Sequence, residues 1–160
     1  MSVAFRRESD DEHLEPKFEI PIAPGPNLVT PRGLRQIASR LADIDAQIAH
    51  ESDPDLLKVL RRDQRYWATR QSSAEPAPTP LPGEVGIGSR VTLRIDGKQR
   101  MIEIVGGDEA DSARGRVAFS APLARAVMGA MVGETIDFAG RTDAIEIVAI
   151  APFDTGSVDD

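Results

Sequence analysis

The stretch VTLRIDGKQRMIEIV, residues 91–105, determines the architecture of the C-terminal half of this chain. Apolar and polar residues alternate through its first part, from residue 91 to residue 95, which is the period of a half-buried β-strand. Asp96 and Gly97 follow directly, and this dipeptide is a strong signal for a two-residue hairpin turn. Residues 101–105 are then the returning strand. The stretch therefore predicts an antiparallel β-hairpin.

More strands are expected on the C-terminal side of this hairpin, and they complete a small sheet. They are residues 116–119, 135–138 and 143–150. After the first of them, Ser120 is a suitable cap for a short helix that has Pro122 in its first turn and ends at Gly129. One helix over the apolar face of a mainly antiparallel sheet is an α+β arrangement. We expect this domain to cover residues 84–152, followed by a tail at 153–160.

The N-terminal side of the sheet domain begins with a proline-rich linker, residues 76–83. Proline stands at every second position from 76 to 82, which enforces an extended and semi-rigid spacer. The linker marks a domain boundary.

Residues 30–75 have the periodicity of paired helices. Thr30 before Pro31 is a helix start, because threonine caps the first turn and proline is tolerated at the first helical position. Apolar residues then repeat at spacings of 3 and 4, at positions 34, 37, 41, 44 and 48. Asp53 and Pro54 begin a second helix that fades near residue 73. The pattern predicts an antiparallel helical hairpin, in effect a short coiled coil.

Residues 1–29 form an extended acidic arm in this interpretation, with three basic and six acidic side chains and four prolines. Phe18, Ile20 and Ile22 alternate with charged or rigid residues, so this run could dock on a surface. The alternative is an acidic tail with no fixed structure.

Composition excludes several classes of protein. The 160 residues carry 19 basic and 26 acidic side chains, a formal net charge of -7, which disfavours free binding to nucleic acid. There is no cysteine, and two histidines far apart in sequence, His13 and His50, cannot supply a histidine triad or a multi-histidine metal site. No stretch approaches the roughly 18 apolar residues of a membrane span, and the N-terminus does not resemble a signal peptide. We expect a cytoplasmic protein.

Three stretches of the C-terminal half carry a family resemblance: IVGGDEAD at 104–111, SAPLARAVMG at 120–129 and VGE at 132–134. Together they resemble the C-terminal domain of the GreA/GreB transcription elongation factors, in the order and near the spacing found in that family. The resemblance implies an FKBP-like sheet domain preceded by an N-terminal antiparallel coiled coil. This is the order of hairpin and sheet expected from the periodicity.

The resemblance also implies RNA polymerase as the partner, with the sheet domain at the rim of the secondary channel and the coiled coil reaching inside. Nascent RNA or DNA would be contacted indirectly, no membrane would be involved, and we expect a monomer with no intrinsic cofactor or metal. Acidic residues at the coiled-coil tip would approach a Mg2+ shared with the polymerase active site and assist transcript cleavage. The chain would be a regulatory factor and not an enzyme. Candidates for polymerase contact on the sheet domain are Asp108, Glu109, Asp111, Ser120, Pro122 and Arg125.

The expected hairpin tip departs from the family pattern. The family's tip signature, approximately GDLSENAEY, is missing, the expected helices are shorter, and the turn is ESDPD at residues 51–55. Asp53 is the first candidate for a metal-directed carboxylate, with Asp55 and Glu51 behind it. Its other possible role is to cap the second helix.

Three functions therefore stay open at the level of sequence. The first is a Gre-like elongation factor that stimulates cleavage of backtracked transcripts. The second is a factor that blocks the channel without assisting cleavage, or opposes Gre factors. The third is an FKBP-type prolyl isomerase, which would need an aromatic-lined pocket and has only Phe119, Phe138 and Phe153 to build it.

Overall fold

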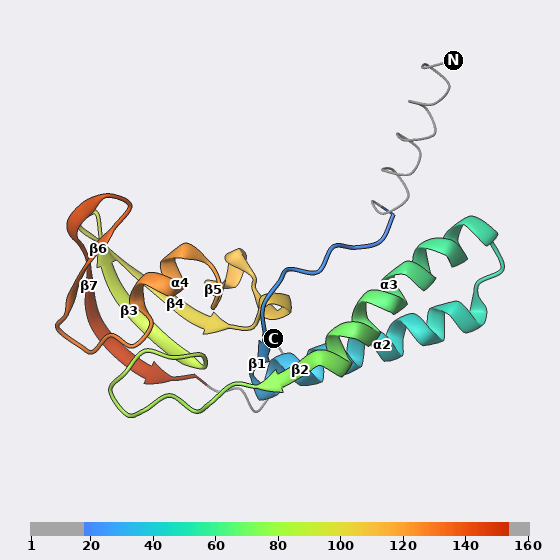
Figure 1. Ribbon diagram of the computed structural model, residues 1–160, viewed down its shortest axis with the longest axis horizontal. Helices are drawn as coiled ribbons and strands as arrows, with labels where there is room; N and C mark the ends of the chain where they lie inside the picture. Colours follow the sequence, from blue (N-terminus) through green and yellow to red (C-terminus); the bar gives the residue numbers. More distant parts are fainter. Residues whose placement is uncertain (1–17, 154–160) are drawn as a thin grey trace, which may run out of the picture. The chain divides into compact units, whose positions relative to one another are not determined.

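The computed structural model describes residues 18–153, which form two compact units (Figure 1). Within the described residues, the first unit contains residues 18–26 and 37–73, and the second contains residues 27–36 and 74–153. None of the described helices is long and apolar enough to cross a membrane.

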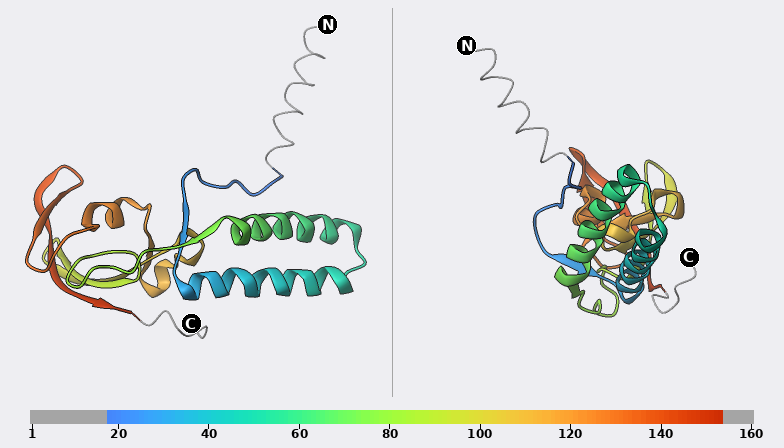
Figure 2. Two further views of the ribbon diagram at one scale, coloured as in Figure 1. Left: turned by 60° about the horizontal axis from the view of Figure 1, so that its bottom comes forward. Right: turned by 90° about the vertical axis from the view of Figure 1, so that its right-hand side faces the viewer.

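The first unit contains the helical hairpin except for the first six residues of its first helix. Helix α2 covers Pro31–His50 and helix α3 covers Pro54–Ser73, each 20 residues and therefore about 30 Å long. The two helices run side by side and are joined by a short turn (Figure 2). This confirms the predicted hairpin, including its start, where the Thr30 hydroxyl accepts the backbone N–H of Gly33 at 3.0 Å.

The packing between α2 and α3 is thin. Leu41, Ile44 and Ile48 on α2 are only half-buried, and α3 has no buried residue. Polar contacts between the helices contribute as well: Gln64 donates a hydrogen bond of 2.7 Å to Asp45. A helix of this length is marginally stable alone in water, and burial of its apolar face stabilises it. Each helix of the hairpin therefore depends on its pairing with the other.

The second unit contains a five-stranded sheet in the order β5-β4-β3-β7-β6. The strands are β3 (Ser89–Ile95), β4 (Lys98–Val105), β5 (Arg116–Ala118), β6 (Thr135–Phe138) and β7 (Arg141–Pro152). The predicted hairpin is β3–β4, in which Ile95 pairs with Lys98 across a turn where Asp96 and Gly97 both have positive φ. That geometry belongs to the turn type which the Asp-Gly dipeptide favours.

The sheet is mainly antiparallel, as predicted, with one parallel strand pair. Strand β5 pairs with β4 in parallel, with Ile104 opposite Val117, so the sheet is mixed. The reason lies in the connection, because the chain from residue 106 to residue 115 passes through two short 3-10 turns before it returns along β4. Parallel neighbours need such a crossover, whereas a tight turn produces antiparallel ones.

The core lies between the sheet and the short helix α4, Pro122–Val127. Leu93 and Ile104 are fully buried on the inner face of the sheet, together with Ile147 of β7, and Val127 of α4 is buried against the same cluster. Their positions follow from the period of two along each strand.

Two details at the edges differ from the sequence expectations. The expected cap Ser120 does not cap α4: the N-cap residue is Ala121, with no side-chain hydrogen bond, because Pro122 occupies the first helical position one residue later. In addition, β1 (Asn27–Val29) and β2 (Ala74–Pro76) form a separate two-stranded parallel sheet. Each strand has three residues, too few for a period to be visible.

The β1–β2 pair moves the boundary between the units. This small sheet takes residues from all three segments expected there: the arm (1–29), the hairpin (30–75) and the linker (76–83). Directly after β2, Ala77 donates a backbone hydrogen bond of 2.9 Å to Val29. Residues 27–36 consequently belong to the second unit, which differs from the expected boundary at residue 30. Most of the expected arm, residues 1–17, and most of the expected tail, residues 154–160, lie outside the described residues.

Candidate functional site

The hairpin turn presents three carboxylates, and two of them organise the backbone of the turn. One carboxylate oxygen of Asp53 accepts the backbone N–H of Asp55 at 2.9 Å, which is a helix cap. One oxygen of Glu51 accepts the N–H groups of Ser52 and Asp53 at 3.1 and 3.2 Å. Asp55 lies in the first turn of α3, where a negative charge is stabilised by the helix dipole. The predicted capping role of Asp53 is therefore present.

The turn is exposed at Asp53 and Asp55 and half-buried at Glu51. Across residues 18–153, no group of three or more acidic or histidine side chains could hold a metal ion.

On the second unit, Glu109 does not lie on the surface as the sequence interpretation expected. Its side chain is 1% exposed and is held by Thr30, just before α2, and by Arg32 in the first turn of α2. The Thr30 hydroxyl donates to one oxygen at 2.6 Å, and Nε of Arg32 donates to the other at 2.7 Å. Arg32 is also buried, and its guanidinium lies 5.0 Å from the ring centroid of Phe153. A buried, fully engaged carboxylate cannot make a direct contact with a partner.

This ion pair continues into a larger charged network. Glu103 on β4 accepts from Arg90 at 2.8 Å and from Arg116 at 3.3 Å, and one nitrogen of Arg32 lies 4.0 Å from it. Glu103 and Arg116 are nearly buried, whereas Arg90 is about half exposed. Sequence reasoning missed this network, because its members come from five separate segments of the chain.

The other candidates on the second unit lie in the chain segments before and after β5, one of the two edge strands of the sheet. Asp108 and Asp111 lie in the segment before β5, and Asp111 accepts the backbone N–H of Ala113 at 3.1 Å. Ser120 follows β5 and is exposed, as are Pro122 and Arg125 on α4. Asp108, Asp111 and Ser120 thus lie just before or just after β5, Pro122 and Arg125 lie on α4, and Glu109 is withdrawn into the interior.

The three phenylalanines of the isomerase alternative do not form a common aromatic pocket. Phe119 and Phe138 pack against the hydrophobic core, while Phe153 is buried beside Arg32. A proline ring would need aromatic side chains around one apolar hollow. The arrangement gives no support to prolyl isomerase activity.

Comparison with known proteins gives a specific match for the second unit. Residues 79–152 match the family described as transcription elongation factor GreA/GreB, C-terminal. Transcription elongation factor GreA of Sinorhizobium medicae is 37% identical over 71 residues, which cover 42% of this chain and 45% of that protein. The GreA of Mycoplasma capricolum is 34% identical over 101 residues, 62% of each chain. The chain thus spans less than half the length of the first of these relatives.

Solved structures resemble the chain more weakly. The GreA factor homolog Gfh1 of Thermus thermophilus aligns with 79% of this chain and 99% of its own, at 18% identity and a TM-score of 0.36. A GreA/GreB factor from Nitrosomonas europaea aligns with 79% of this chain at 16% identity and a TM-score of 0.38. Scores this low do not support a shared arrangement, so the assignment depends on the sequence match.

Proposed function

We propose that this chain belongs to the GreA/GreB family, whose C-terminal domain residues 79–152 match, and that it binds RNA polymerase at the secondary channel and regulates transcript elongation. The match of residues 79–152 is the observation that carries this proposal. A polymerase partner also accommodates the net charge of -7, because the factor would contact protein at a channel entrance instead of wrapping nucleic acid.

We place the polymerase-binding surface at the β5 edge of the sheet domain. Ser120 is exposed directly after β5, Pro122 and Arg125 are exposed on the neighbouring helix α4, and Asp108 and Asp111 lie in the segment before β5. A surface of mixed charge next to apolar groups suits a regulatory interface, which has a polar rim and a small number of anchor residues.

The hairpin is the part that would enter the channel. Its tip supplies one or two carboxylates, so any Mg2+ involved would be the one that the polymerase holds, and any cleavage would be performed by the polymerase active site. In this proposal the chain is a monomeric, cytoplasmic regulatory factor and not an enzyme, and its contact with nascent RNA or DNA is indirect.

Binding to core RNA polymerase tests the proposal. We expect the full chain to associate at low salt and Arg125→Glu to weaken the association about tenfold, because a charge reversal at an interface opposes the partner's complementary charge. Lys98→Glu is the matched control, because Lys98 is exposed at the start of β4, away from the β5 edge, and this substitution should leave binding unchanged. Absence of any association, or equal effects of the two reversals, would remove the proposal.

A transcript-cleavage assay on a backtracked complex separates the two roles proposed for the tip. The informative variant is Asp53→Asn, because asparagine caps a helix as well as aspartate does and only the charge is lost. Cleavage that is stimulated by the wild type and lost in this variant supports a helper. Polymerase binding with no cleavage, and with inhibition of a separate cleavage factor, supports a blocker. Because Glu51 and Asp53 already bind backbone N–H groups, the blocker is a specific second candidate.

A further inference from the structure

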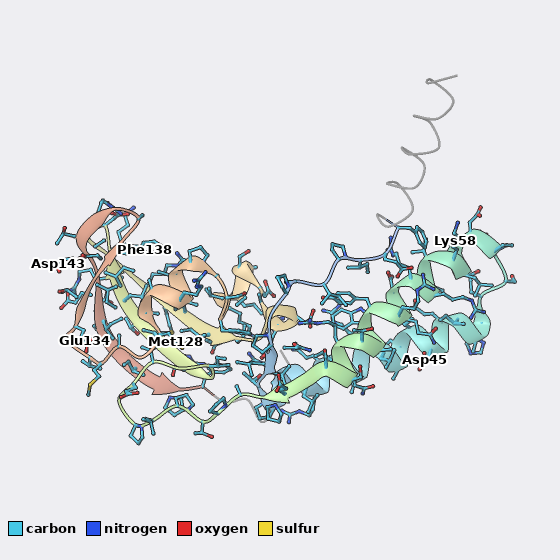
Figure 3. All side chains as sticks on the ribbon, in the orientation of Figure 1. Asp45, Lys58, Met128, Glu134, Phe138 and Asp143 are labelled. Atoms are coloured by element: carbon cyan, nitrogen blue, oxygen red, sulfur yellow. The ribbon has the colours of Figure 1, made fainter. Side chains whose placement is uncertain are left out.

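Helix α3 carries a continuous stripe of positive charge. Its members recur at positions i, i+3, i+4 and i+7, which lie on one side of a helix. We call them the basic face: Lys58, Arg61, Arg62 and Arg65. Lys58 lies near the turn end of α3 (Figure 3). A stripe of this kind attracts anions. Within the first unit, residues of the N-terminal segment already lie against it.

Two consecutive residues of the N-terminal segment contact the basic face. The ring of Phe18 has the ammonium of Lys58 5.1 Å from its centroid and the guanidinium of Arg62 5.6 Å away. Glu19 receives two hydrogen bonds from Arg65, at 2.5 and 3.1 Å. Phe18 therefore contacts two members of the basic face, and Glu19 binds a third through both carboxylate oxygens.

The chemistry of the contact is complementary. An aromatic ring attracts cations to its surface through its quadrupole, and a guanidinium binds a carboxylate with two parallel N–H groups. The hydrogen bond from Arg65 lowers the pKa of Glu19, as expected for a carboxylate held in its charged form. Both partners of this ion pair are about half exposed, at 52% each. Exposed contacts of this kind are individually weak, so the segment can dock and release reversibly.

We propose that Phe18 and Glu19 form an intramolecular strap that occupies the basic face of α3 and has to leave before an anionic partner can bind there. The strap satisfies the same groups that an anionic ligand would use, so the two compete directly. This inference goes beyond the proposed function and does not depend on it, since the competition exists whether or not polymerase is the partner.

The expected size of the effect follows from the population of the open state. If the strap covers the face about 80–90% of the time, the apparent affinity for an anion is about 5- to 10-fold weaker than the intrinsic one. Removing the strap should recover that factor. Added salt should reduce the difference, because it screens both the strap and the probe.

The experiment uses the full chain and inorganic polyphosphate as the probe. Phe18→Ala/Glu19→Gln should bind polyphosphate about 5- to 10-fold more tightly than the wild type. Glu134→Gln is the matched control: it removes one exposed negative charge from the second unit and should change affinity less than twofold. Lys58→Gln/Arg65→Gln should bind more weakly than the wild type. A double variant that binds no more tightly than the control would overturn the proposal.

A second measurement detects the strap without any ligand. The chain has three lysines, Lys17, Lys58 and Lys98, so acetylation of each can be followed separately. Lys58 should react several-fold faster, relative to Lys98, once Phe18 and Glu19 are replaced, because the ring no longer lies against its ammonium. An unchanged ratio would show that the strap does not cover the face in solution and would also overturn the proposal.

Discussion

The ion pair between Arg32 and Glu109 should be one of the most strongly coupled contacts of the second unit. Both side chains are almost fully buried, at 2% and 1% exposure, with 2.7 Å between Nε and the carboxylate oxygen. The first perturbation is Glu109→Leu, which removes the charge and keeps similar bulk. It leaves the Arg32 guanidinium in the interior without its nearest carboxylate, and it removes the acceptor for the Thr30 hydroxyl.

The expected cost is about 3–5 kcal/mol of unfolding free energy, the usual result of breaking a buried pair from one side. Arg32→Met should lower the free energy of unfolding by a similar amount, because the Glu109 carboxylate then stays buried beside the Thr30 hydroxyl without the guanidinium that balances its charge. The double variant Arg32→Met/Glu109→Leu has no buried charge left at this position. It should be much more stable than the sum of the single losses predicts, with a coupling energy of about 3 kcal/mol.

Hydrogen exchange of the β3–β4 amides measures the stability of the second unit directly, and urea denaturation followed by circular dichroism gives an independent value. Fluorescence of the single tryptophan, Trp67, reports the helical hairpin separately. Single variants that cost less than about 1 kcal/mol, or a double variant whose loss equals the sum of the two, would refute the reasoning that Glu109 is a structural anchor.

Three other predictions concern a glycine, a cap and a surface ion pair. Gly106→Ala should lower the free energy of unfolding, measured by urea denaturation, by roughly 1–3 kcal/mol, because a Cβ there would lie 2.6 Å from the backbone carbonyl oxygen of Leu28. A variant as stable as the wild type would contradict this contact. Asp53→Ala should lower hairpin stability by about 1 kcal/mol while Asp53→Asn stays within a few tenths, as measured by the helical circular dichroism signal on heating; equal losses would argue against the cap. The hydrogen bond from Arg141 should hold the pKa of Asp96 below its ordinary value of 3.8. The stabilisation from this pair is therefore present above that pH and is lost as the pH falls through the lowered pKa. In a carbon-13 titration, the pKa of Asp96 should be higher in Arg141→Gln than in the wild type, and an unchanged pKa would contradict the ion pair.

The elements of the sheet domain could be predicted because their signals are local. The alternation from Val91 to Ile95 and the Asp96-Gly97 turn each need only a few neighbouring residues to be recognised. The helical hairpin was predictable for the same reason, since its apolar spacing and its two Thr/Asp-Pro starts are both local patterns.

The parts that could not be predicted are non-local. The parallel pairing of β1 with β2 joins residues that lie about 47 positions apart in the sequence, for example Asn27 and Ala74. The burial of Glu109 depends on Thr30 and Arg32, 79 and 77 positions away, and within its own segment Glu109 resembles an ordinary surface acid. The only sequence signal for the strap was the alternation that begins at Phe18; it suggested docking but not the partner surface.

Site-directed crosslinking tests the central claim most directly. The chain has no cysteine, so Ser120→Cys provides a single attachment point for a photoreactive group at the β5 edge, and Arg141→Cys provides a control on the opposite side of the sheet. In a mixture with core RNA polymerase, the group at residue 120 should crosslink to the rim of the secondary channel, while the group at residue 141 should not. Crosslinks to another region of the polymerase, or none above the control, would contradict the account.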